Sequence, residues 1–288
     1  MNLTLVGVGL IGGSVALDLR EKKFAKQITG VETNPTHAEQ ALKLKLVDKI
    51  EPLERAVKDS DLVIISTPVN TICKLLPEIL NFIGDRTTVT DMGSTKEMIA
   101  LSILNHKRAK QFVPSHPMAG TENSGPQSAI RHLFNGKTAV ICDKEKSGQK
   151  HLQNIESLYG ALEMRCIYMD SKQHDMHVAF VSHLSHISSF ILANTVLDIE
   201  RSASTIFDLA SGGFESTVRL AKSSPEMWMP IFEQNQNNIL LALDAYIRHL
   251  EHFRSTIQEK KFSETKQILS QANEIRRVLD TMNVKGKK

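Results

Sequence analysis

The chain has 288 residues, 41% of them hydrophobic, and 35 basic against 32 acidic residues give a net charge of +3. This length is enough for one large or two ordinary domains, because domains typically have about 100–200 residues. The near balance of charge gives no electrostatic support for nucleic acid as the main partner.

The cysteines and the N-terminus bear on the cellular compartment. Cys73, Cys142 and Cys166 are odd in number, far apart and never spaced as CxxC, which argues against a disulfide framework and fits a reducing compartment. The N-terminus lacks the basic segment and cleavable apolar stretch of a signal peptide. Because no apolar run reaches the ~20 residues of a membrane span, we expect a cytoplasmic protein.

Short apolar runs alternate with amphipathic stretches through the first half of the chain, where Gly12–Lys22 is the first expected helix. This alternation predicts an α/β domain with a doubly wound parallel sheet. The run Leu62–Ser66 is continuously apolar, as in strands that are buried on both faces. The expected strands are Leu3–Val8, Ile28–Glu32, Leu62–Ser66, Thr87–Asp91, Gln111–Pro114, Thr138–Cys142 and Arg165–Met169.

The pattern changes near Asp170, after which apolar positions recur with the period of a helix. We therefore predict two domains, residues 1–169 and residues 170–288, of which the second is all-helical. Its expected helices are Ser171–Leu197, Met227–Tyr246, Ile247–Gln258 and Ser263–Thr281.

A glycine-rich loop follows the first expected strand. It reads Gly7-Val8-Gly9-Leu10-Ile11-Gly12, the G-x-G-x-x-G pattern at a strand-to-helix turn. The first glycine permits a tight turn, the second lets the backbone approach a pyrophosphate, and the third lets helix and strand pack closely. The loop, Leu10 and Ile11 included, therefore predicts a Rossmann-type dinucleotide site.

Glu32 predicts which dinucleotide binds. It ends the second expected strand, twenty residues after Gly12, which is close to the spacing of a ribose-binding acid. A carboxylate there accepts hydrogen bonds from both ribose hydroxyls and repels a 2′-phosphate, and residues 33–36 contain no lysine or arginine. We therefore expect NAD rather than NADP; the alternative is a glycine turn beside an unrelated surface glutamate.

Two further loops follow strands at the carboxyl edge of the sheet, where ligands bind in open α/β sheets. Thr67 and Pro68 follow the third strand, which the proline ends, and we predict that both contact the cofactor. Ser94 lies in the next loop, Asp91–Lys96. It caps the following helix, points at the substrate and cofactor, or does both.

His116 is the leading candidate for chemistry. We expect it just after a strand, in the rigid loop Val113–Glu122 at the ligand edge. Histidine is the side chain best suited to accept a hydroxyl proton near neutral pH. An isolated histidine more often has a structural role, so the surrounding motifs decide whether His116 is catalytic.

Those motifs, in their order along the chain, closely resemble the prephenate/arogenate dehydrogenase family. The resemblance extends from Leu3 to beyond Trp228, and the block Ser-His-Pro-Met-Ala-Gly-Thr-Glu is its most specific part. The motifs are Gly-Val-Gly-Leu-Ile-Gly-Gly-Ser, Ser-Thr-Pro-Val, Asp-Met-Gly-Ser-Thr-Lys, Ser-His-Pro-Met-Ala-Gly-Thr-Glu, Val-Ser-His-Leu-Ser-His and Gly-Gly-Phe-Glu-Ser-Thr-Val-Arg.

The resemblance implies an NAD-dependent oxidative decarboxylation on the route to tyrosine, with prephenate or arogenate as substrate. It implies that His116 accepts a hydrogen bond from the ring hydroxyl and that Ser94 bonds to His116 or to that hydroxyl. Arg219 would pair with a substrate carboxylate, as its planar, permanently charged group suits. The resemblance implies a substrate-side position for His186, and site or neighbouring positions for His183, Glu122, Asp175 and Trp228.

The sequence departs from the family pattern beside two of these positions. Ser216-Thr217-Val218 stands where family members often have an aspartate and a threonine before the arginine. Ser185 stands where the second histidine motif often has proline. Neither change affects a residue to which we assign chemistry.

The histidines at 174, 177, 183 and 186 also raise the question of a metal site. At about 100° per residue, the pair His174 and His177 would point to the opposite side of a continuous helix from the pair His183 and His186. Zinc would also require close cysteine or carboxylate partners. We therefore predict no metal, a polar helix face for the first pair and the substrate side for the second.

Other functions fit parts of the pattern. Dehydrogenases of the 3-hydroxyacid or 6-phosphogluconate type usually rely on a lysine of a second-domain helix, and residues 178–197 contain none. A non-catalytic NAD-sensing module would need the glycine loop but not His116, Ser94 and Arg219 together. The apolar stripes at 187–197 and 239–250 exceed what a single helical layer needs, which favours a homodimer through the second half.

Overall fold

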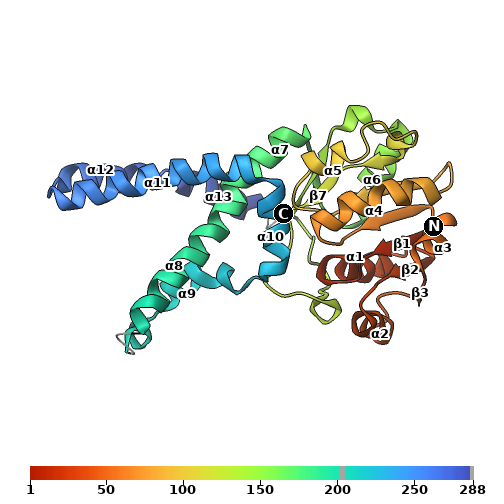
Figure 1. The fold of residues 1–288 in the computed structure, drawn as a ribbon, viewed down its shortest axis with the longest axis horizontal. Helices are drawn as coiled ribbons and strands as arrows, with labels where there is room; N and C mark the ends of the chain where they lie inside the picture. Colours follow the sequence, from red (N-terminus) through yellow and green to blue (C-terminus); the bar gives the residue numbers. More distant parts are fainter. Residues whose placement is uncertain (202–204, 286–288) are drawn as a thin grey trace. The chain divides into compact units, whose positions relative to one another are not determined.

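The computed structural model describes residues 1–201 and 205–285, with side chains described to residue 280. Its larger sheet has six parallel strands in the order β3-β2-β1-β4-β5-β6, with the switch in strand order between β1 and β4. The predicted Rossmann-type sheet is thereby confirmed. Figure 1 labels the half of this sheet that contains β1, β2 and β3. The strands are β1 (Asn2–Val6), β2 (Gln27–Val31), β3 (Lys49–Ile50), β4 (Leu62–Ile65), β5 (Thr88–Asp91) and β6 (Phe112–Val113).

Helices cover both faces of this sheet because its strands are apolar on both sides. Along β1, Leu3 and Leu5 belong to one core cluster together with residues of α1 and α6, whereas Val6 belongs to a second cluster with residues of α4. This split follows from the alternation of side chains across a strand. The helices are α1 (Leu10–Glu21), α2 (Pro35–Lys43), α3 (Leu53–Lys58), α4 (Val69–Phe82), α5 (Glu97–Leu101) and α6 (Gln149–Ala161).

The last strands form a separate sheet of three, which the sequence pattern did not separate from the first. β7 (Ser115–Pro117) is antiparallel to β8 (Thr138–Cys142), and β9 (Arg165–Met169) is parallel to β8. Pro114 lies between β6 and β7, and its carbonyl accepts a hydrogen bond from Cys142 N at 2.9 Å. The chain therefore leaves the large sheet at this proline and pairs with β8 instead.

The remainder of the chain is helical in the residues that the structure describes, as predicted. The expected helix Met227–Tyr246 is two helices, which divide at Asn235. The elements are α7 (Ser171–Val178), the π-helix η4 (Ala179–His183), α8 (Leu184–Glu200), α9 (Gly212–Val218), α10 (Pro225–Gln234), α11 (Gln236–Gln258), α12 (Phe262–Ala272) and α13 (Ile275–Lys285). Short 3-10 turns complete the chain at η1 (Ala109–Gln111), η2 (Pro126–Ser128), η3 (Lys144–Lys146), η5 (Ile206–Leu209) and η6 (Arg219–Lys222).

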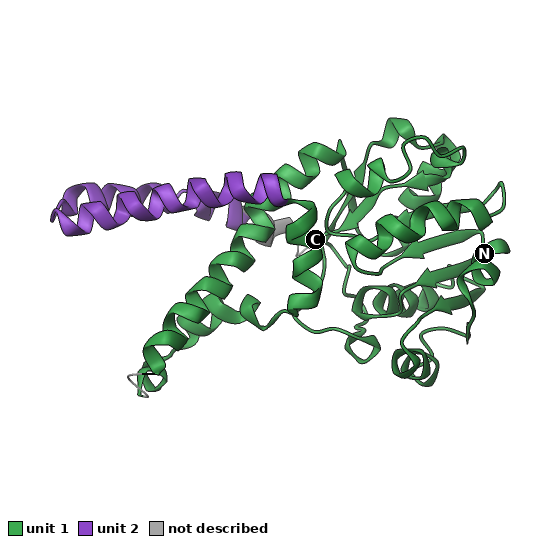
Figure 2. Cartoon of the chain, viewed as in Figure 1, with its two compact units in different colours: residues 1–235 green, residues 236–288 purple. Residues whose placement is uncertain are grey.

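The chain forms two compact units, residues 1–235 and 236–288 (Figure 2). The first unit includes α7 to α10 because α10 packs on the domain that contains the six-stranded sheet. Trp228 and Ile231 of α10 belong to the same core cluster as residues of α4, and Thr95 Oγ1 donates to Gln234 Oε1 at 2.6 Å. The predicted domain boundary at 169/170 therefore stays a prediction.

One helical stretch bears on the expectation that no apolar run reaches the length of a membrane span. Ser171–Glu200 is long and apolar enough for a membrane span by length and composition, and 22% of its most apolar window is buried. Scattered polar residues such as Ser185 and Ser189 interrupt the apolar runs, so that no single run reached this length. Within α8, Ile191 is 58% and Leu197 45% exposed, so the described residues of a single chain cover this apolar surface only in part.

Candidate active site

The glycine loop has the shape that a dinucleotide requires. The φ of Gly7 is +88°, a conformation that favours glycine. A Cβ at Gly12 would lie 2.4 Å from Gly7 O and 2.5 Å from Ser66 Oγ, whereas a Cβ at Gly9 would have nothing within 4 Å. The loop is therefore closed where β1 meets α1 and open at Gly9, where α1 begins with uncapped backbone amides that suit a phosphate.

The other predicted cofactor residues lie around this loop. Both carboxylate oxygens of Glu32 accept backbone hydrogen bonds, Oε2 from Val8 N at 3.2 Å and Oε1 from Asn34 N at 3.0 Å. Thr67 Oγ1 is buried and has no partner among the residues whose side chains are described, and Pro68 is exposed beside it. An open helix end, an oriented carboxylate and an unpaired hydroxyl together fit NAD.

Leu10 and Ile11 differ in exposure. The side chain of Leu10 belongs to the core beneath the loop, and that of Ile11 is half-buried against the same core. If Leu10 contacts a cofactor, it therefore does so through its backbone at the start of α1.

His116 lies on β7, where it pairs with Val140 of β8, and not in a loop as expected. Its side chain is buried, with 9% of the residue exposed. Burial lowers the pKa of His116 well below its usual value, and His174, Lys96 and His183 lower it further. The imidazole is therefore neutral at physiological pH and has a nitrogen free to accept a proton.

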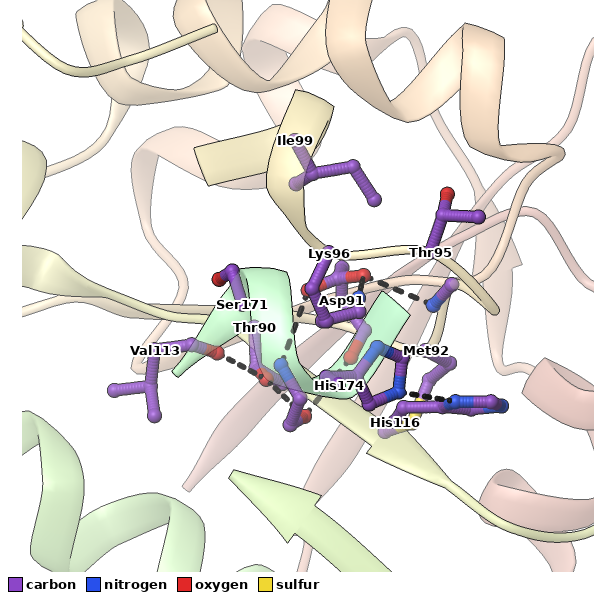
Figure 3. A network of polar contacts seen from close by, with 12 residues as sticks. Thr90, Asp91, Met92, Thr95, Lys96, Ile99, Val113, His116, Ser171 and His174 are labelled. Carbon is purple, nitrogen blue, oxygen red and sulfur yellow. Dashed lines mark hydrogen bonds and ion pairs between the residues drawn. The ribbon is translucent and has the colours of Figure 1, made fainter. Parts of the chain in front are cut away.

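His174 and Asp175 continue from His116 in a chain of hydrogen bonds. His116 Nδ1 lies 2.9 Å from His174 Nε2 (Figure 3), and His174 Nδ1 lies 2.7 Å from Asp175 Oδ1. His174 is 1% exposed, so the expectation that it lies on a polar helix face was wrong; His177 is exposed. The sequence missed His174 because its burial depends on contacts with β7 and α5.

Asp175 also fixes the start of α5. Its Oδ1 accepts from Lys96 N at 2.7 Å and its Oδ2 from Glu97 N at 2.9 Å. The alternative in which Ser94 caps this helix was therefore wrong, since α5 begins three residues later and α7 supplies its cap. Ser94 is half-buried, and no hydrogen bond among the described residues joins it to His116.

A buried ion pair supports the same loop. Lys96 Nζ and Asp91 Oδ2 form an ion pair, and both side chains are fully buried. Asp91 also accepts hydrogen bonds from Gly93 N at 2.9 Å and Ser115 N at 3.2 Å. Burial raises the pKa of Asp91, and the ammonium of Lys96 opposes this effect. Through the hydrogen bond from Ser115 N, Asp91 joins the end of β5 to β7, the strand that carries His116.

The π-helix η4 changes the directions of the later histidines. It spans Ala179–His183, and a π turn holds more residues than an α turn, so the assumed 100° per residue does not apply there. His183 is 1% exposed, and its Nδ1 lies 3.2 Å from Nδ2 of Asn235, which also donates to Asp175 O at 2.7 Å. His174 and His183 therefore face the same interior region, against the expectation of opposite sides.

His186 and Trp228 form an aromatic contact next to His183. The rings of His186 and Trp228 lie 3.8 Å apart between centroids, and that of His183 meets the indole edge to face at 5.7 Å. His186 Nδ1 donates to Ser182 O at 3.0 Å, and burial lowers the pKa of His186. Trp228 Nε1 is buried without a partner among the described side chains, so it is a donor available to a ligand.

Arg219 and Glu122 come together from distant parts of the chain. Arg219 Nη1 donates to Glu122 Oε2 at 2.9 Å, and the two side chains are 51% and 23% exposed. The Glu122 backbone amide is the main cause of the lowered pKa of Glu122, and the guanidinium of Arg219 lowers it further. The pair joins η6 to the loop after β7, which continues from His116.

A dinucleotide loop and a buried, neutral imidazole in the same compact unit define the class of the protein, an NAD-dependent oxidoreductase. The model of the prephenate dehydrogenase nucleotide-binding domain matches residues 15–168, and that of the prephenate dehydrogenase dimerization domain matches residues 170–271. The chain therefore belongs to the prephenate dehydrogenase family.

Individual relatives agree with this assignment. Prephenate dehydrogenase of Bacillus subtilis is 31% identical over 263 residues, which cover 90% of this chain and 70% of that protein. Cyclohexadienyl dehydrogenase of Zymomonas mobilis is 26% identical, with 89% of this chain and 88% of that protein covered. A crystal structure of Aquifex aeolicus prephenate dehydrogenase with hydroxyphenyl propionate and NAD+ is 30% identical and has a TM-score of 0.88, over 97% of this chain and 98% of that one.

Proposed function

We propose that this protein catalyses the NAD-dependent oxidative decarboxylation of prephenate to 4-hydroxyphenylpyruvate. The observation that carries the proposal is the buried, neutral His116 in a chain whose two halves match the two prephenate dehydrogenase domain models. Residues 1–169 would bind the cofactor, and residues 170–288 would supply substrate contacts and the subunit interface.

The residues around Gly9 would hold the cofactor. The uncapped start of α1 would receive its pyrophosphate, and Glu32 would accept hydrogen bonds from the ribose hydroxyls. The unpaired hydroxyl of Thr67 lies beside the loop and is available to the same ligand. When bound, NAD accepts a hydride from the carbinol carbon of the substrate.

His116 would take the hydroxyl proton on Nε2, because its Nδ1 is already bonded to His174. As the C–O bond becomes a carbonyl, the carbon–carboxylate bond breaks and carbon dioxide leaves. The electron pair of the broken bond stays with the ring, which becomes aromatic. The phenolic oxygen then recovers the proton from Nε2. The protein needs only to align the reactants, move this proton and hold the carboxylates.

Three groups are available to bind the substrate. The half-exposed guanidinium of Arg219 can pair with a carboxylate, and Trp228 Nε1 is an unpaired donor. His186 offers its Nε2, since its Nδ1 donates to Ser182 O. Ser94 would hold the substrate hydroxyl. Glu122 would position Arg219, and His183 would position Trp228.

Arogenate is the second candidate substrate. The reaction is the same, because arogenate differs from prephenate only in an amino group in place of the side-chain keto group. Arogenate dehydrogenase of Synechocystis has a structure that is 28% identical to this chain, with a TM-score of 0.75 over 97% of this chain and 100% of that one.

An absorbance assay at the NADH band tests the activity directly. Prephenate and arogenate are each offered with NAD and with NADP, and we expect turnover with NAD and prephenate. His116→Ala should lower turnover by about 10²-fold or more, which is the usual contribution of a general base, while calorimetry shows that NAD still binds. Unchanged turnover in His116→Ala would exclude the proposed role.

The assembly proposed is a cytoplasmic homodimer through the helical part of the chain. The domain model that matches residues 170–271 is that of a dimerization domain, and α8 carries exposed apolar side chains. A second copy of the chain would cover them, which also accounts for a helix that is apolar enough for a membrane.

A further inference from the structure

The hydrogen bonds behind His116 determine which of its nitrogens carries a proton. The argument begins at Asp175, whose two oxygens accept from the backbone amides of Lys96 and Glu97. A backbone amide can only donate, so both carboxylate oxygens are acceptors here. His174 Nδ1, 2.7 Å from Asp175 Oδ1, must therefore carry a hydrogen and donate it.

The same logic passes through the two rings. A neutral imidazole with a hydrogen on Nδ1 has an unprotonated Nε2, so His174 Nε2 is an acceptor. Its partner at 2.9 Å, His116 Nδ1, must then be the donor. That leaves His116 Nε2 unprotonated, which is the state a general base requires.

We infer that His174 and Asp175 are positioning residues that hold His116 in the tautomer with a free Nε2. This inference rests on the proposed function for its catalytic meaning, and the tautomer itself is a property of the free protein. When His116 takes a proton, His174 Nε2 accepts from the imidazolium and Asp175 lies one ring further on. A carboxylate behind a catalytic histidine orients the ring and stabilises its charged form in other enzymes.

Burial makes the arrangement specific. His116, His174 and Asp175 are 9%, 1% and 1% exposed, so water has little access to supply an alternative partner. A buried donor or acceptor that loses its partner is costly. Burial also lowers the pKa of His174, and Asp175 opposes that shift. The ring that links His116 to the carboxylate therefore stays neutral and keeps its accepting nitrogen.

The tautomer can be measured without substrate. The full chain is labelled with ¹⁵N-histidine, and two-bond ¹⁵N–¹H correlations at pH 8 distinguish protonated from unprotonated ring nitrogens; the His116 signals are those lost in His116→Gln. We expect a protonated Nδ1 and an unprotonated Nε2 at His116. A proton on Nε2 would overturn the inference, whatever substrate the enzyme uses.

Two variants of His174 test the consequence for turnover. His174→Leu removes the acceptor, and we expect kcat to fall by about 10²-fold or more, with the KM for NAD within about twofold of the wild type. In His174→Gln the amide oxygen can accept from His116 Nδ1, so kcat should recover to within about tenfold of the wild type. Equal kcat in the two variants, at either level, would overturn the inference.

His177 provides the matched control, because it lies on the same helix and is exposed. His177→Leu and His177→Gln should leave kcat and the His116 signals unchanged, and thermal melting checks that all four variants are folded. If the wild type turns over neither prephenate nor arogenate, the proposed function fails. The nitrogen signals of the wild type still decide the tautomer in that case.

Discussion

Arg219 and Glu122 are 97 residues apart in sequence, and their side chains meet at 2.9 Å. The pair lies at the solvent, with half of the Arg219 side chain exposed. Water screens exposed ion pairs, which contribute little to stability, so this contact costs little to open. The guanidinium can therefore exchange a protein carboxylate for a substrate carboxylate.

Arg219→Gln should weaken substrate binding more than chemistry. The variant keeps a donor but loses the charge and the planar pair of N–H groups that bind a carboxylate. We expect the KM for prephenate to rise by about tenfold or more, which corresponds to about 1.4 kcal/mol, while NAD affinity is unchanged. Steady-state kinetics and calorimetry measure both. Arg201→Gln, which changes an exposed arginine after α8, is the control, and an equal rise in its KM would refute the assignment.

The loop glycines should separate folding from cofactor binding. Gly12→Ala places a methyl group against Gly7 O and Ser66 Oγ, and overpacking of this kind costs about 1–3 kcal/mol. Gly9→Ala meets open space, so its stability should change by less than about 1 kcal/mol, yet its methyl group takes room that the pyrophosphate needs. Urea unfolding and NAD titration should therefore rank the two variants in opposite orders. Tight NAD binding by Gly9→Ala would contradict the proposed site.

Glu32 should decide between the two dinucleotides. Glu32→Gln removes the charge that would repel a 2′-phosphate and weakens the acceptor for the ribose hydroxyls. We expect kcat/KM to fall by about tenfold with NAD, the scale of one charge-assisted hydrogen bond, and to rise with NADP. Glu39→Gln, at an exposed position of α2, is the control. An unchanged ratio of the two values in Glu32→Gln would show that other residues select the cofactor.

Local signals allowed most of the sheet and the cofactor loop to be predicted. The bounds of β8 and β9 match the expected strands, and Gly7, Gly9 and Gly12 take the positions that their spacing indicated. Both features depend on residues close in sequence, as in a tight turn or an apolar run. The family, and with it NAD, followed from the order of the loop motifs and was confirmed by the domain models.

Features that depend on distant contacts could not be predicted. β7 is short and follows Pro114, and its pairing with β8 leaves no mark in the local pattern. Lysine is rarely buried in proteins, and nothing in the local sequence shows that Lys96 is fully buried against Asp91. The direction of His174 relative to His183 depended on a π turn that the helical period does not reveal.

Stability should fall on the acid side of neutrality because of His183. Burial lowers its pKa from 6.5 to about 4, so between these values the unfolded chain binds a proton that the folded chain does not. The contribution of His183 to the free energy of unfolding is therefore fully present above pH 6.5 and is lost as the pH falls to 4. The total loss is about 3 kcal/mol, at about 1.4 kcal/mol per pH unit. Urea unfolding at pH 7, 6 and 5 measures the slope.

His183→Gln tests that slope, because the amide keeps an acceptor for Asn235 but does not titrate. Below pH 6.5, we expect the variant to take up about one proton fewer than the wild type on unfolding, so that its free energy of unfolding changes less steeply with pH. His116 and His174 remain in the variant, and their lowered pKa values leave part of the dependence in place. His177→Gln serves as the exposed control. Parallel pH curves for wild type and His183→Gln would disprove the shift.

Exposed apolar side chains on α8 lead to a prediction about assembly. Ser189 is buried, whereas Ile191 is 58% and Leu192 37% exposed. The helix as a whole is apolar enough to span a membrane by length and composition. Ile191→Glu should destabilise a homodimer by about 3–5 kcal/mol, because the charge would be buried without a partner. Multi-angle light scattering across micromolar concentrations should show a dimer for the wild type and a monomer for the variant. Leu44→Glu, at a position 45% exposed after α2, should remain a dimer, and a monomeric wild type would remove the proposed interface altogether.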